Sequence, residues 1–167
     1  MATYDELFAI GESFEAFVAH GLPVEIEAVR AVQRKLAEPG AISQGTWQRL
    51  QALEGSYQLL VAGEMWCPDC QINIAVMDHL RRAQPRIALA IITKGRAEDE
   101  LKERLGLERI PIPLVAVLDA DFQLAGRFVE RPRDVIEGGD ALKPAYRAGD
   151  YLDSTARDLL AIFEAAR

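Results

Sequence analysis

Cysteine, histidine and basic runs are all scarce in this sequence. The 167 residues include two cysteines and two histidines, and the formal net charge is −7. No run of five or more basic residues occurs, which argues against nucleic acid or an anionic membrane surface as a partner. No apolar run approaches the roughly 18 residues that span a bilayer. The first residues carry no basic segment before an apolar core, so we expect no signal peptide.

The composition is that of a soluble globular protein. Half of the residues are apolar and 27% are charged, and the length suits one domain that buries a core without disulfide or metal cross-links. With neither a signal peptide nor a membrane span expected, the predicted compartment is the cytoplasm. Thiols stay reduced in that compartment, where a C-x-x-C motif is more often catalytic or metal-binding than structural.

The first 55 residues have the pattern of helices alone. We expect one helix over residues 3–20, opened by a capping box of Thr3 and Glu6, and a second over residues 23–38. A third, shorter helix is expected over residues 46–55. Because no flexible linker follows and the apolar stripes need covering, we expect residues 1–55 to be a helical extension that packs on a domain formed by residues 56–167.

After Gly55 the pattern alternates between strands and helices. The expected order is strand, helix, strand, helix, strand, strand, helix, at residues 57–63, 69–83, 86–93, 97–106, 114–119, 124–130 and 151–166. A loop rich in proline and glycine is expected over residues 131–150. The order predicts an α/β fold with a mixed sheet of four or five strands and helices on both faces.

The two cysteines lie at the junction between the first expected strand and the helix after it. Pro68 suits the first helical position, where a missing N–H costs nothing. Cys67 is then at the helix N-terminus, where free N–H groups and the helix dipole favour its thiolate. Cys70 lies one turn further on the same face, within disulfide reach. This spacing indicates a nucleophilic thiol with a resolving partner.

Two other interpretations of the cysteine pair remain open. A metal site needs two more ligands, and the soft candidates are His20 and His79. His79 lies about 13 Å further along the same helix and cannot join Cys70 in one site, so we expect no metal unless two chains share it. The second interpretation is a pair of inert, structural thiols.

The motif Trp66-Cys67-Pro68-Asp69-Cys70 resembles the W-C-x-x-C motif of the thioredoxin superfamily. A second match is the Ile112-Pro113 pair before the expected hairpin, which is similar to the family's cis proline facing the cysteines. The helical N-terminal part resembles that of a group of bacterial thioredoxin-like proteins. The resemblance implies a thioredoxin-like fold.

Two positions depart from the family pattern. Thioredoxins carry a buried aspartate six residues before the first cysteine, where this sequence has Val61. An internal base for Cys70 is therefore missing unless Glu64 or Asp69 takes that role. Asp69 also stands where thioredoxins have proline, and its carboxylate stabilises the first helical turn but repels a nearby thiolate.

The resemblance implies a thiol–disulfide oxidoreductase in cell redox homeostasis. Cys67 is expected to attack and Cys70 to resolve, with Pro68, Asp69 and Glu64 modulating them. Trp66, Ile112 and Pro113 are expected to contact a protein or small-molecule disulfide. No cofactor is implied, only an external reductant of the thioredoxin reductase or glutathione type.

Two alternatives accompany these assignments. The first alternative is that the protein is an interaction or redox-sensing module without turnover. The second is that Trp66 packs in the buried core and does not contact substrate. The basic residues Lys94, Arg96, Arg131 and Arg133 are candidates to flank the site and attract an anionic partner such as glutathione.

Overall fold

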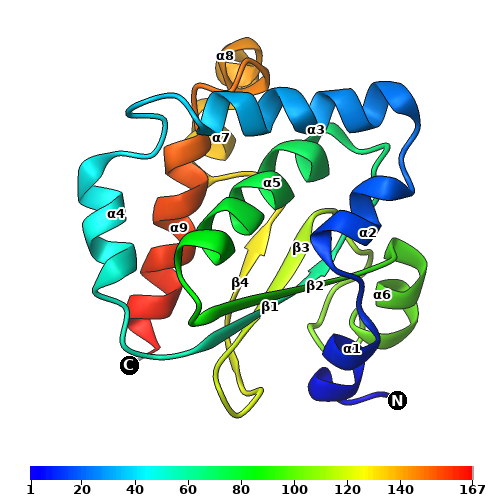
Figure 1. Ribbon diagram of the computed structural model, residues 1–167. Helices are drawn as coiled ribbons and strands as arrows, with labels where there is room; N and C mark the ends of the chain where they lie inside the picture. The colour runs from blue at the N-terminus through cyan, green and yellow to red at the C-terminus, as the bar shows by residue number, and fades with distance from the viewer. Residues whose placement is uncertain (167) are drawn as a thin grey trace.

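A computed structural model describes residues 1–166 (Figure 1). The strands are β1 (Tyr57–Ala62), β2 (Ile87–Ile92), β3 (Leu114–Leu118) and β4 (Leu124–Val129). The helices are α1 (Tyr4–Ile10), α2 (Phe14–Ala19), α3 (Pro23–Leu36), α4 (Gln44–Gln51), α5 (Pro68–Ala83), α6 (Lys94–Glu100), α7 (Arg133–Gly138), the 3-10 helix η1 (Gly139–Leu142), α8 (Lys143–Arg147) and α9 (Leu152–Ala165). No helix in the described part of the chain is long and apolar enough to cross a membrane.

The described strands form one mixed sheet in the order β2-β1-β3-β4. Strand β1 pairs with β2 in parallel and with β3 in antiparallel orientation, and β3 and β4 form an antiparallel hairpin. The two central strands, β1 and β3, are almost entirely buried, as expected for strands covered on both faces. The expected α/β fold with a four-stranded mixed sheet is confirmed.

Neighbouring residues of β4 show which helices cover each face. A side chain at Gly126 would meet Ile162 of α9, whereas Arg127 donates a hydrogen bond to the Leu105 carbonyl after α6. Since consecutive strand residues point to opposite faces, α9 and the segment after α6 lie on opposite sides of the sheet. Helix α5 packs beside α9, as Figure 1 shows.

The N-terminal helices share one hydrophobic core with the rest of the chain. Helix α3 packs on α5, α4 packs on α9, and α1 contacts β2. Buried side chains of these helices, such as Leu7, Phe14 and Val29, belong to the same cluster as the sheet residues. The expected packing of these helices is thus present, while the boundary between residues 55 and 56 stays a prediction.

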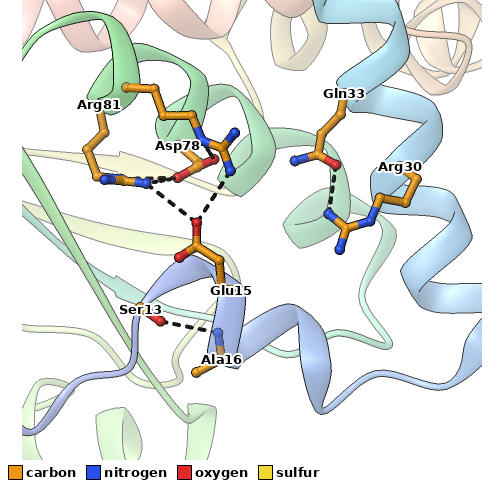
Figure 2. A network of polar contacts seen from close by, with 8 residues as sticks. Ser13, Glu15, Ala16, Arg30, Gln33, Asp78 and Arg81 are labelled. Carbon is orange, nitrogen blue, oxygen red and sulfur yellow. Dashed lines mark hydrogen bonds and ion pairs between the residues drawn. The ribbon is translucent and has the colours of Figure 1, made fainter.

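An ion-pair network ties α2 to α5 (Figure 2). The buried carboxylate of Asp78 pairs with Arg81 at 2.6 Å and with Arg82 at 2.8 Å. Both arginines also face Glu15 of α2, at 3.8 Å and 3.3 Å. The carboxylate is compensated by two cations, which is what its burial requires.

The single helix expected over residues 3–20 is wrong, because the chain breaks into α1 and α2. The expected capping box of Thr3 and Glu6 does open α1. At Gly11 the backbone approaches β2 so closely that a Cβ atom would lie 2.7 Å from Ala90 Cβ. Glu12 then forms an antiparallel bridge with Ile91. This tertiary contact outweighs the continuous helical pattern.

The irregular loop expected over residues 131–150 is also wrong. This segment contains α7, η1 and α8, and it buries the ring of Tyr146. Pro132 precedes α7 and Pro144 lies in the first turn of α8, positions that prolines tolerate. Helix α6 differs as well: it begins at Lys94, capped by Thr93, and ends at Glu100 instead of continuing to residue 106.

Candidate active site

The two cysteines lie where β1 leads into α5, as the sequence predicts. Cys67 is the N-cap residue of α5, with extended backbone angles, and Pro68 occupies the first turn. Asp69 and Cys70 follow inside that turn. The free N–H groups at the start of the helix therefore lie next to Cys67.

Both cysteines are free thiols and both are buried. They approach each other to 3.5 Å. Cys67 is 6% exposed and Cys70 is 0% exposed. Its place before the first helical turn predicts that Cys67 faces solvent beside Trp66, and that Cys70, one turn deeper, is less exposed. Cys70 is indeed the deeper of the two, but Cys67 does not face open solvent, so that part of the prediction is wrong.

The two thiols differ sharply in acidity. The pKa of Cys67 is lowered to about 7, mainly because the Cys70 thiol donates a hydrogen bond to it. Burial and the charge of Asp69 raise the Cys67 pKa, while the backbone N–H groups of Cys70 and Asp69 lower it. The pKa of Cys70 is raised, first by its hydrogen bond to Cys67 and then by burial. The pair thus holds its first negative charge on Cys67.

The loop before β3 faces Cys67. The Ile112–Pro113 peptide bond is cis, as expected from the resemblance. The Sγ atom of Cys67 lies 3.7 Å from the carbonyl oxygen of Ile112 and points its S–H toward it. The roles of Ile112 and Pro113 in substrate binding stay predictions.

Trp66 is the exposed part of the motif. Its side chain is 60% exposed, which excludes a purely buried packing role. It lines a cavity of about 300 Å³ with Gly63, Glu64 and Met65, and the N-terminal residues Phe17 and His20 form another part of the wall. The N-terminal helices thus contribute to the wall of the cavity at Trp66.

Of the two carboxylates expected to modulate the cysteines, that of Glu64 is engaged away from the thiols. Glu64 Oε2 accepts a hydrogen bond of 2.8 Å from the backbone N–H of Lys94. Only the backbone N–H of Glu64 reaches Cys70, where it lowers the thiol's pKa. Val61, which stands where thioredoxins carry the buried aspartate, is fully buried and supplies no carboxylate. No carboxylate in the described residues is hydrogen-bonded to Cys70.

Asp69 lies in a buried polar network that the sequence reading did not identify. Its Oδ1 atom accepts hydrogen bonds from Tyr146 Oη at 2.7 Å and from Arg131 Nε at 3.1 Å. Asn73 joins this network, and its spacing of four from Asp69 on one helix face was the available signal. Nothing in the sequence indicated that Tyr146 lies near Asp69, since Tyr146 belongs to the segment expected to be irregular.

The remaining sequence candidates lie apart from the thiols. His79 packs its ring on Trp47, and burial lowers its pKa, so it is a residue of the core edge. The side chains of Lys94 and Arg133 pair with Glu98 and Glu137. Among the described residues, no group of three or more histidine, cysteine or acidic side chains is arranged to hold a metal ion.

Comparisons with known proteins agree with this geometry. A family model described as Thioredoxin matches residues 11–143. A crystal structure of a protein of unknown function from Pseudomonas aeruginosa is 57% identical, covers 100% of both chains and superposes with a TM-score of 0.96. The crystal structure of an HIV epitope scaffold is 55% identical, covers 98% of both chains and has a TM-score of 0.93. Among curated proteins, no match was found. With most of its length matched by this family's model, the chain belongs to the thioredoxin family.

Proposed function

We propose that the protein is a thiol–disulfide oxidoreductase whose redox-active centre is Cys67 and Cys70. The observation that carries the proposal is the asymmetry of this close pair: one thiol with a pKa of about 7 at a helix N-terminus beside a deeper thiol with a raised pKa. An attacking thiol has an optimal pKa near the ambient pH, and a resolving thiol has to lie within bonding reach.

The reaction has two exchanges. The Cys67 thiolate attacks one sulfur of a substrate disulfide, forms a mixed disulfide and releases the other sulfur as a thiolate, which takes up a proton. Cys70 then loses its proton and attacks Cys67 Sγ. The second substrate thiol leaves, and a Cys67–Cys70 disulfide remains. The substrate gains two electrons from the protein. An external thiol reductant then supplies two electrons to the Cys67–Cys70 disulfide and restores the dithiol.

The loop at Ile112 and the exposed ring of Trp66 are the proposed substrate contacts. An extended substrate strand pairs with the backbone around Ile112 and Pro113, in the manner of strand addition. Trp66 supplies a rigid apolar surface beside the cysteines. The substrate is a disulfide in a protein or small molecule, the reductant is of the thioredoxin reductase or glutathione type, and the setting is the cytoplasm, where the dithiol form persists.

The burial of both thiols favours a second candidate, a redox-sensing or interaction module without turnover. A thiol that is 6% exposed reaches a protein disulfide only if the surface around Trp66 or the Ile112 loop adapts to the substrate. A sensor would form the Cys67–Cys70 disulfide with small oxidants and change its surface without repeated exchange.

Turnover separates these two functions. The protein is mixed with a protein disulfide and excess dithiothreitol, and the rate of disulfide reduction is compared with that of Cys67→Ser. The oxidoreductase predicts multiple turnovers that the variant lacks. If the wild-type protein forms its own disulfide yet does not exceed the rate of the variant, the sensor is the correct assignment. The reduction potential of the pair then shows whether the protein acts as reductant or oxidant.

A further inference from the structure

Asp69 places a buried carboxylate inside the redox motif. The residue is 7% exposed, and its Oδ1 atom receives both hydrogen bonds described above, one from Tyr146 and one from Arg131. A buried charge is costly unless it is paired and hydrogen-bonded. The two donors come from outside the motif: Arg131 follows β4, and Tyr146 lies in α8.

The donors are themselves held in place. Asn73 Nδ2 lies within hydrogen-bond distance of Tyr146 Oη, at 2.9 Å, and of the Glu130 carbonyl, at 3.0 Å. Thr155 of α9 donates a hydrogen bond of 2.7 Å to Asn73 Oδ1. Both Asn73 and Thr155 are fully buried. The network therefore joins the cysteine helix to α8 and α9.

The network also reaches the loop that faces Cys67. Glu130 has a φ of 64°, which is unusual for a residue other than glycine. Its backbone N–H donates to the Pro113 carbonyl at 2.8 Å, and its own carbonyl accepts from Asn73. This conformation places Arg131, the next residue, against Asp69. Strained backbone at such a position points to a functional constraint.

An unpaired negative charge at Asp69 would oppose the formation of the Cys67 thiolate, which is the attacking group. Its negative charge raises the pKa of both thiols, including the one that attacks. The Arg131 guanidinium lies against this carboxylate and carries the opposite charge. Tyr146 remains a neutral donor, because burial and its bond to Asp69 raise its pKa.

We propose that Arg131 and Tyr146 are positioning residues for the dithiol: they hold and partly neutralise the Asp69 carboxylate, so that its charge opposes the Cys67 thiolate less. This role rests on the proposed function, since it concerns how readily Cys67 attacks. The titratable and charged groups beside Asp69 are the Cys67 and Cys70 thiols, Arg131 from the segment after β4, and Tyr146 from α8, and the charge of Glu130 acts on Arg131.

The rate of Cys67 alkylation at pH 6 tests the proposal without any disulfide substrate. At this pH the rate follows the thiolate fraction, and mass spectrometry identifies the modified cysteine. Arg131→Gln is expected to slow alkylation about threefold, the effect of half a unit in the thiol's pKa. Tyr146→Phe is expected to slow it in the same direction. Asp69→Asn is expected to accelerate it.

Matched variants separate positioning from general damage. Arg133→Gln removes the same charge from the same segment, at a residue that pairs with Glu137 and not with Asp69. Tyr57→Phe removes a buried tyrosine hydroxyl and its hydrogen bond to the Phe163 carbonyl, at the far end of β1. Both are expected to leave the alkylation rate unchanged. Arg131→Lys keeps the charge and is expected to recover most of the rate. Because Arg131 is partly exposed, its variants carry the test if Tyr146→Phe fails to fold.

The combination with Asp69→Asn decides whether Arg131 acts through Asp69. In that background Arg131→Gln is expected to have little further effect. The proposal is overturned if Arg131→Gln behaves like Arg133→Gln, or if its full effect persists without the Asp69 carboxylate. A protein that shows the expected shifts but no turnover contradicts the proposed function alone, whereas an active protein without the shifts contradicts this inference alone.

Discussion

The Sγ atom of Cys67 and the carbonyl oxygen of Ile112 lie 3.7 Å apart, although 45 positions separate the two residues. A substrate strand that pairs with the backbone around Ile112 would therefore come within reach of the first thiol. This contact links the two motifs on which the proposed function depends.

Cys67 is expected to react with iodoacetamide in a pH-dependent manner with an inflection near pH 7. Because its pKa is lowered, the reactive thiolate persists at neutral pH, whereas an ordinary cysteine ionises near about 8.5. Below the inflection the rate should fall about tenfold per pH unit, since the thiolate fraction does so. Cys70, with its raised pKa, should remain unmodified over the same range. An inflection near 8.5 for Cys67 would contradict this prediction.

Replacing Cys70 with serine is expected to preserve attack by Cys67 but to block resolution. Stable mixed disulfides should then accumulate on Cys67 and appear on non-reducing gels. Replacing Cys67 with serine should abolish both the reaction and the trapping, although the fold survives because neither change removes much volume. If Cys67→Ser traps partners as well as Cys70→Ser does, the roles of the two thiols are wrongly assigned.

Gly63→Ala is expected to destabilise the fold beneath the cysteines. The added methyl group would lie 2.7 Å from Ile74 Cδ1 and 3.4 Å from Cys70 Sγ. Overpacking of this kind costs about 1–3 kcal/mol of unfolding free energy, which urea denaturation measures. Gly45→Ala is the control, because nothing lies within 4 Å of its added atom. Equal stability of the two variants would show that the β1–α5 junction adapts easily.

Arg81→Gln is expected to lower stability through Asp78. The Asp78 carboxylate is buried, and the variant removes its closest cationic partner, at 2.6 Å. The loss should be about 1–3 kcal/mol, the usual cost of weakening the compensation of a buried charge. Arg34→Gln is a matched control, because its pair with Glu27 is exposed on both sides and should contribute little. A loss no larger than in this control would mean that Arg82 alone satisfies Asp78.

Limited proteolysis is expected to leave the N-terminal helices attached to the rest of the chain. Their buried residues, including Leu36 and Ile42 near the end of this region, belong to the common core. Loss of this cover would expose the apolar side of α5. Release of a stable fragment that begins near residue 56 would show that the extension is an independent unit.

The strands and the cysteine junction could be predicted from the sequence because their signals are local. Apolar runs such as residues 57–63 and 86–93 are long enough for buried strands, and Pro68 after Cys67 indicates a helix start. The cis bond at Pro113 was predicted from the family resemblance and is confirmed.

The features that the sequence did not predict depend on contacts between distant segments. The helix breaks at Gly11 because its backbone approaches Ala90 closely, and the spacing of apolar residues in the sequence does not reveal such a contact. The surroundings of Asp69 depend on Tyr146, which is 77 positions away. Proline and glycine in residues 131–150 suggested a loop, but burial of the Tyr146 ring stabilises helices there. The contact of Cys67 Sγ with the Ile112 carbonyl likewise joins segments 45 positions apart.

The bridge between Glu12 and Ile91 also has a consequence for self-association. Two reciprocal backbone hydrogen bonds of 2.8 Å and 2.9 Å occupy the outer side of β2 at this point. An open edge strand offers a row of unsatisfied N–H and C=O groups to any other extended chain, which is a common origin of aggregation. By laying its own first residues along that edge, the protein interrupts the row and hinders a second copy from extending the sheet there.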